Sequence, residues 1–229
     1  MEIAFYVVMG IFAATSLLHL LFCLLEKEKF RKATKPLTTF LLTTGILLLV
    51  IIYPEMPFPK HAIWIAGFFV TIGDIFTLKI KSRPLFITGS VFYAIGHILN
   101  AYVMITMLSY TIAWWVYLII AIGTLLIALA LYPATRRIFG RIAYAVNLYL
   151  GLNLINIAFA IMLLLDGKPI IAVMILIGYI LYLVSGIILV YAAYGKDIRR
   201  RDFYIMLFLL SGQIMIMLGL VNTLLIISQ

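Results

Sequence analysis

Residues 170–194 read IIAVMILIGYILYLVSGIILVYAAY, a run without a single charged side chain. Crossing the apolar core of a bilayer as an α-helix takes about 20 such residues. Long apolar runs of this kind recur along the whole chain, whereas membrane β-strands would alternate apolar and polar residues over about ten positions. The stretch therefore predicts a membrane-spanning helix and an all-α fold.

Seven further segments have the same character, so the sequence predicts a polytopic membrane protein in which residues 1–229 form a single bundle of eight transmembrane helices. No linker or second domain interrupts the pattern. The predicted spans are Ile3–Leu25, Leu37–Tyr53, His61–Thr77, Leu85–Leu108, Ile112–Tyr132, Ile142–Leu165, Ile170–Tyr194 and Phe203–Ile226.

The composition excludes a soluble or disordered protein. The chain is 66% hydrophobic and only 11% charged, and its mean hydropathy is +1.21. Soluble domains have about 45–50% apolar and about 25% charged residues. The net charge of +9 alone would suit a nucleic-acid partner, but the positions of the basic residues indicate membrane lipids instead.

Basic residues separate cleanly between the predicted loops. Fifteen of the seventeen Lys and Arg residues lie in the first, third, fifth and seventh loops, and only Lys60 and Lys168 lie elsewhere. Basic short loops remain cytoplasmic, which predicts both termini outside and an integral protein of a bacterial plasma membrane. A basic inner rim would also attract anionic lipid head groups.

No familiar cofactor or metal motif is present. A single cysteine, Cys23, and three histidines without metal-binding spacing predict no metal site. The chain also lacks a nucleophile elbow, a phosphate-binding loop and a dinucleotide fingerprint, so we expect no cofactor and no serine-nucleophile chemistry.

Asp74 is the only acidic residue within a predicted span. A carboxylate at a helix centre costs about 2.5–3.5 kcal/mol on insertion scales, so its presence needs a reason. One interpretation is an interfacial acid paired with Lys79 or Lys81. We favour the other, a buried acid that donates a proton to a substrate.

Polar side chains on other spans extend this candidate site. Tyr93, His97 and Asn100 share one helix face with Ser90, because residues three, four and seven positions apart align on a helix. Lipid would not solvate such a stripe, so we expect it to line an interior cavity together with Asp74. Further candidates for that interior are Asn147, Asn153, Tyr182, Ser185 and Gln213.

Several short motifs together form a pattern that extends over nearly the whole chain. They are the Lys-Pro-Leu segment within Thr34–Thr39, Gly73-Asp74 followed by Gly89 and His97, Gly178-Tyr179, Leu183-Val184-Ser185, and Gln213. In these motifs, in its length and in its eight predicted spans, the chain resembles the YhhN family of membrane proteins, whose characterised members are lysoplasmalogenases.

The resemblance implies hydrolysis of the vinyl ether of a lysoplasmalogen, with a lysophospholipid or another single-tailed lipid as substrate. Asp74 and His97 would be catalytic, and Lys35 or Lys79 would hold the phosphate. One departure is that family members typically have Ser-Asp in the seventh span, where this chain has Ser185-Gly186. The alternative is an inactive member that binds lipid or a proton-coupled carrier of small solutes.

Overall fold

The computed structural model describes residues 1–53, 59–79, 82–108, 113–194 and 198–227. All regular structure within them is helical, which confirms the predicted fold class. The elements are α1 (Glu2–Leu24), α2 (Glu28–Ile52), α3 (Lys60–Phe76), the short 3-10 helix η1 (Thr77–Lys79), α4 (Arg83–Met107), α5 (Trp114–Phe139), the 3-10 helix η2 (Gly140–Ile142), α6 (Ala143–Leu165), α7 (Pro169–Tyr194) and α8 (Arg201–Ile227).

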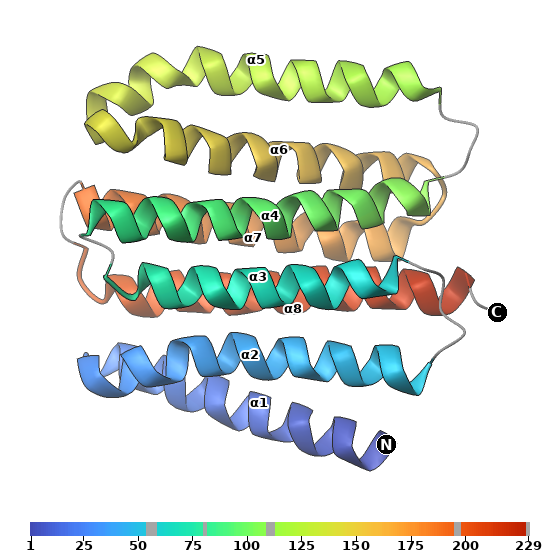
Figure 1. Ribbon diagram of the computed structural model, residues 1–229, viewed down its shortest axis with the longest axis horizontal. Coiled ribbons are helices and arrows are strands. Elements are labelled where there is room, and N and C mark those ends of the chain that lie inside the picture. The colour runs from blue at the N-terminus through green and yellow to red at the C-terminus, as the bar shows by residue number, and fades with distance from the viewer. Residues whose placement is uncertain (54–58, 80–81, 109–112, 195–197, 228–229) are drawn as a thin grey trace.

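The helices lie side by side and alternate in direction, with α1 and α5 at opposite edges of the bundle (Figure 1). The closest pairs are α7 with α8, α3 with α4 and α1 with α2, while α5 packs mainly against α6. Figure 1 also shows that the start of α1 and the end of α8 lie at the same end. The predicted basic loops therefore follow α1, α3, α5 and α7 at the opposite end, which we call the basic end.

Within the described residues, seven helical segments are long and apolar enough to cross a membrane. One of them, Trp114–Leu165, contains α5, η2 and α6 together. Large apolar side chains on the outer surface remain exposed, including Trp114 at 75% and Leu126 at 60%. Such exposure would be costly in water and is expected in lipid, so the chain is an integral membrane protein.

Two helices extend beyond their predicted spans at the basic end. Helix α2 starts at Glu28 rather than Leu37 and runs through Pro36. Helix α5 ends at Phe139 rather than Tyr132 and runs through Pro133. The apolar pattern indicated the membrane-spanning part only, because a helix can continue past the lipid on charged residues. As a result, Lys35 lies on a helix and not in a loop.

Two pairs of glycines let neighbouring helices approach closely. A Cβ atom on Gly73 of α3 would lie 3.2 Å from the backbone oxygen of Gly89 on α4. A Cβ on Gly212 of α8 would lie only 2.7 Å from the oxygen of Gly178 on α7. Small residues serve this purpose in membrane helix packing. The first pair fixes the position of Asp74, the next residue along α3.

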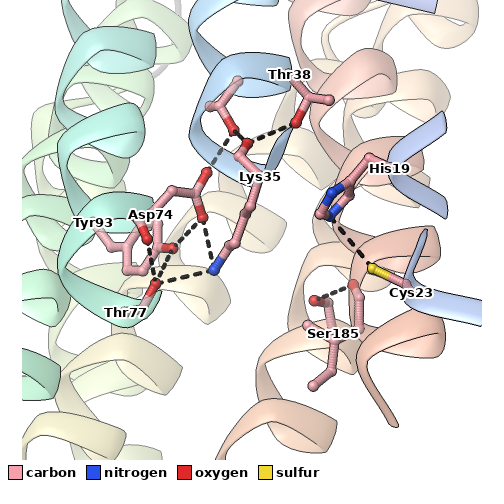
Figure 2. Close-up of polar contacts among 10 residues, drawn as sticks. His19, Cys23, Lys35, Thr38, Asp74, Thr77, Tyr93 and Ser185 are labelled. Atoms are coloured by element: carbon pink, nitrogen blue, oxygen red, sulfur yellow. Dashed lines mark hydrogen bonds and ion pairs between the residues drawn. The ribbon is translucent and has the colours of Figure 1, made fainter. Parts of the chain in front are cut away.

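His19 and Cys23 of α1 form a separate polar cluster beside α2 (Figure 2). The Nδ1 atom of His19 lies 2.5 Å from Oγ1 of Thr34, and its Nε2 lies 3.5 Å from Sγ of Cys23. Both ring nitrogens therefore have partners, and this histidine is explained by packing between α1 and α2.

Candidate active site

Asp74 lies at the centre of a fully buried polar cluster formed by α2, α3 and α4 (Figure 2). Thr39 donates a hydrogen bond to Oδ2 at 2.5 Å, and the Tyr93 hydroxyl donates one to Oδ1 at 2.6 Å. The ammonium of Lys35 lies 3.1 Å from the same Oδ1. All three neighbours are donors, so the carboxyl group acts as an acceptor toward each.

Thr77 on η1 connects Lys35 and Tyr93, the two residues that contact Oδ1 of Asp74. Lys35 Nζ donates to its hydroxyl at 3.0 Å, and that hydroxyl lies 3.2 Å from the hydroxyl of Tyr93. A buried ion pair is stable only when further hydrogen bonds satisfy its charged groups. Thr39, Thr77 and Tyr93 provide them here.

The partner of Asp74 is Lys35, one helix away, and not the Lys79 that the sequence suggested. Lys79 is exposed on η1, and Lys81 lies outside the described residues. The side chain of Lys35 is 11% exposed and that of Asp74 is 0% exposed. Because this ion pair is deeply buried, Asp74 is not simply an acid at the membrane interface.

A cavity of about 30 Å³, which we call the apolar cavity, adjoins this cluster. Lys35, Thr77 and Tyr93 form one part of its wall, and aliphatic side chains such as Leu189 and Leu209 form much of the rest. A cavity needs about 10–15 Å³ to hold one water. In this conformation the apolar cavity therefore holds no alkyl tail.

A second cavity of about 20 Å³, which we call the polar cavity, also adjoins the cluster, because Thr39 lines it. Thr43 lines it from α2 as well, and apolar side chains such as Leu42 and Met217 form part of its wall. Tyr182 lines both cavities. The other polar side chains of its wall are His97, Asn100 and Gln213.

Asp74 contacts residues that line both cavities. Its Oδ1 contacts Tyr93 and Lys35, which line the apolar cavity. Its Oδ2 contacts Thr39, which lines the polar cavity. One carboxyl group can therefore exchange protons with both cavities through different oxygens.

His97 is buried, 3% exposed, and is surrounded by tyrosines. Its ring centroid lies 5.1 Å from that of Tyr182, 5.7 Å from Tyr149 and 5.9 Å from Tyr179. Neither ring nitrogen makes a hydrogen bond with another described residue. The predicted stripe on α4 is thus divided, since Tyr93 faces Asp74 while His97 and Asn100 face the polar cavity.

The remaining predicted residues lie in different places. Asn147 donates to Thr135 of α5 and so joins two peripheral helices. Asn153 donates to the backbone oxygen of Tyr149, and Ser185 donates to that of Ile205 while also lining the apolar cavity. The structure thus brings Tyr93, Lys35 and Ser185 to the apolar cavity and leaves Asn147 at the α5–α6 contact.

An open hollow of about 860 Å³ indents the basic end. Arg31 and Asp202 form an ion pair across it, joining α2 to α8. Lys79 lies in its wall, in agreement with a position near a charged head group. The other basic residues of the wall are Lys32, Arg199, Arg200 and Arg201.

A family model named YhhN family matches residues 58–220, which is more than half of the chain. The chain belongs to the YhhN family. The resemblance seen in the sequence is therefore confirmed. The match contains Asp74, His97 and Gln213 but begins after Lys35 and Thr39. No curated protein and no solved structure matches the chain.

In this YhhN protein, Tyr149 occupies the space where the seventh-span acid would be expected. A Cβ atom on Gly186 would lie 2.4 Å from Cε1 and 2.5 Å from the hydroxyl oxygen of Tyr149. That hydroxyl donates to the backbone oxygen of Tyr182 at 3.0 Å. The glycine is therefore required by the tyrosine ring packed against it.

Four residues of the site were missing from the predicted set. Thr39 binds Asp74 directly, and its signal was its position one helical turn after Lys35. Thr77, three residues after Asp74, accepts a hydrogen bond from Lys35. Tyr149 and Tyr179 surround His97. Their signal was helical spacing, because they precede the predicted residues Asn153 and Tyr182 by four and three positions.

Proposed function

We propose that this protein hydrolyses the vinyl ether bond of a lysoplasmalogen, giving a fatty aldehyde and a glycerophospho-alcohol. The family includes lysoplasmalogenases, which supports this choice of reaction. The observation that carries it is the buried Asp74–Lys35 ion pair, whose lysine lines the apolar cavity. Such a pair places a transferable proton in the apolar interior, where a lipid chain can reach it.

The reaction begins with transfer of a proton to the alkenyl carbon that is not bonded to oxygen. Asp74 and Lys35 together hold one transferable proton, and moving it from Nζ to Oδ1 leaves both groups uncharged. Uncharged groups are the forms that an apolar interior tolerates. Asp74 then acts as the general acid, a role that contributes about 10²–10⁴-fold in enzymes generally.

Proton transfer leaves an oxocarbenium ion, and the Asp74 carboxylate that remains stabilises its positive charge. Addition of water to the charged carbon gives a hemiacetal, which breaks down to the aldehyde and the alcohol. His97 contributes its imidazole ring to the wall of the neighbouring polar cavity. Its place among three tyrosines keeps it within the interior and away from lipid.

The lipid lies with its phosphate in the basic hollow, where Lys79 and Arg199 are available for charge-assisted bonds. Lys35 is engaged by Asp74 and is assigned to the proton step. The alkenyl end enters the apolar cavity, which must widen to accept it. Tyr149 is the group best placed to move, because it lines that cavity and its ring covers the open face of Gly186 in α7.

This assignment includes a membrane topology. All eight α-helices cross the bilayer, both termini lie outside, and the basic end faces the cytoplasm of a bacterial cell. The gathering of the basic loops at one end of the bundle supports this orientation, because short basic loops remain cytoplasmic.

Purified protein incubated with a lysoplasmalogen in detergent should release fatty aldehyde. The matched control is the lysophospholipid with a saturated ether at the same position, which offers no alkenyl carbon to protonate and should release none. Absence of aldehyde from the vinyl ether lipid, with protein that is folded and binds it, would reject the proposed reaction.

A lipid-binding protein without hydrolase activity is the second candidate. The observation that favours it is the tyrosine ring at Gly186, where the family resemblance leads one to expect an acid. The same assay separates the two, because this candidate binds both lipids equally and releases aldehyde from neither. A proton-coupled carrier would instead move a solute across vesicle membranes in response to a pH gradient.

A further inference from the structure

The polar cavity contains more hydrogen-bonding capacity than the surrounding protein uses. Four side chains of its wall, each at most 4% exposed, are His97, Asn100, Tyr182 and Gln213. Both ring nitrogens of His97, the Asn100 carbonyl oxygen, the Tyr182 hydroxyl and both Gln213 amide atoms form no hydrogen bond with other described residues. Leaving a buried polar group unpaired costs about 1–3 kcal/mol, so a ligand is expected.

The size of the cavity identifies the class of ligand. Its volume of about 20 Å³ suits one water, which needs about 10–15 Å³ and two to four polar partners. Tyr182 and Gln213 both line the cavity, and neither side chain forms a hydrogen bond of normal geometry with described residues, so one water can serve as a partner to both. A larger solute would not fit without displacing Thr39 or Met217 from the wall.

Thr39 connects this cavity to Asp74. Its hydroxyl lines the cavity and donates to Oδ2 at 2.5 Å, so its oxygen can accept a hydrogen bond from a water beside it. We propose that the polar cavity binds a water through His97, Asn100, Tyr182 and Gln213, and that this water is the one consumed by hydrolysis. The second half of the proposal rests on the proposed function; the first half does not.

The water oxygen reaches the oxocarbenium carbon past Tyr182, which lines both cavities. It forms a bond to that carbon, and one of its O–H bonds breaks. The proton passes to the Thr39 oxygen while the Thr39 proton passes to Oδ2 of Asp74, which restores the acid. The hemiacetal then breaks down: its hydroxyl proton moves to the glycerol oxygen, the bond from that oxygen to the carbon breaks, and the aldehyde and the alcohol separate. Gln213 and His97 act as positioning residues, because they hold the water and touch no part of the lipid.

Turnover in deuterium oxide tests the catalytic half. In the parent, water captures the cation at once, so recovered lipid should contain little deuterium. In Gln213→Leu or His97→Phe the cation should instead return a proton from the same carbon to Asp74. Aldehyde release should then fall at least about tenfold, while deuterium appears at the alkenyl carbon of the recovered lipid.

If Gln213 and His97 have a purely structural role, aldehyde release and deuterium incorporation should fall together, because protonation of the lipid would also fail. That result, or aldehyde release at the parent rate in both variants, would overturn the catalytic half. Ser16→Ala is the matched control, since Ser16 is buried on α1 and its hydroxyl also forms no hydrogen bond with described residues. It should leave both quantities unchanged.

Direct observation of the water tests the binding half even if the parent releases no aldehyde. An experimental map that resolves ordered waters should show density within hydrogen-bonding distance of at least two of the four side chains. The density should be lost in Gln213→Leu. A cavity without density in the parent protein would overturn the binding half, and a parent that shows the water but releases no aldehyde would reject the proposed function alone.

Discussion

Lys35 Nζ lies 3.1 Å from Oδ1 of Asp74, and both side chains are buried between α2 and α3. The two residues are far apart in the sequence, and neither is plausible alone in the interior of a membrane protein, where an isolated charge is costly. Together they make an uncharged unit overall. This relationship explains why a span that should be apolar contains an acid.

The first prediction concerns the stability of this pair. Lys35→Met and Asp74→Asn should each destabilise the protein by about 3–5 kcal/mol if they leave a buried charge without its partner. The double variant should be far less destabilised than the sum of the two, because it removes both charges. Thermal unfolding of the purified proteins in one detergent measures all four members of the cycle.

Additive losses in that cycle would mean that the two side chains do not interact. Thr44→Val is a suitable reference variant. Thr44 also lies on α2, but it is only half-buried and its hydroxyl bonds the backbone of its own helix, at Phe40. Its stability should remain within about 0.5 kcal/mol of the parent, as for most surface substitutions.

Tyr93→Phe should weaken the Asp74 cluster but leave the other contacts of Asp74 in place. The substitution removes a hydroxyl 2.6 Å from Oδ1 of Asp74 and 3.2 Å from Thr77 while keeping the ring. A hydrogen bond to a charged group contributes about 1.5–3 kcal/mol, and we expect a loss of stability in this range with reduced aldehyde release. Tyr144→Phe, at an exposed position on α6, should change neither measurement.

Gly186 should not accept a side chain while Tyr149 is present. A Cβ would lie 2.4 Å from the tyrosine ring, and overpacking of this kind costs about 1–3 kcal/mol. Gly186→Ala should therefore lower the unfolding temperature, and adding Tyr149→Ala should remove most of this additional cost. An equal cost of Gly186→Ala with and without the tyrosine would contradict the observed packing.

The contact between Gly186 and Tyr149 also determines whether the acid expected from the family resemblance can be restored at position 186. Gly186→Asp alone should give no gain in aldehyde release, because Tyr149 occupies the space for the carboxylate. Gly186→Asp combined with Tyr149→Ala provides that space and is the variant in which a gain is expected. A gain from the single substitution would show that the tyrosine moves aside readily.

Membrane orientation can be measured with two cysteine variants. Arg199→Cys places a thiol in the wall of the basic hollow, and Glu2→Cys places one at the opposite end of the bundle. The native Cys23 is 1% exposed and should give little background. A membrane-impermeant maleimide should label Glu2→Cys in intact cells and Arg199→Cys only after the membrane is opened. The reverse pattern would invert the proposed topology.

The sequence was sufficient for the fold class because long apolar runs have few alternatives. It also identified Asp74, since an acid within a span is conspicuous without any knowledge of packing. It could not identify Lys35 as the partner, because the apolar pattern placed that lysine in a loop and α2 in fact begins at Glu28. Proximity in sequence offered only Lys79 or Lys81 as partners, in the interpretation that we did not favour, whereas packing of α2 against α3 decided the contact.

Residue spacing also could not predict that the polar side chains on one face of α4 would line different cavities. Helical periodicity placed Tyr93 and His97 on one face, and both are indeed buried. Which cavity each one lines depends on the neighbouring helices, and Tyr182 of α7 separates the two cavities. The tyrosines around His97 come from α6 and α7, so only the tertiary structure brings them together.

The most direct test of the central claim is the rate of aldehyde release by Asp74→Asn relative to the parent and to Asp74→Glu. Asparagine keeps the shape of the side chain but cannot deliver a proton, so its rate should fall at least about a hundredfold. Asp74→Glu keeps a carboxyl group and should retain more activity than Asp74→Asn. Each rate is taken on protein shown to be folded at the assay temperature. An Asp74→Asn protein that keeps more than half of the parent rate would contradict the assignment of Asp74 as the general acid.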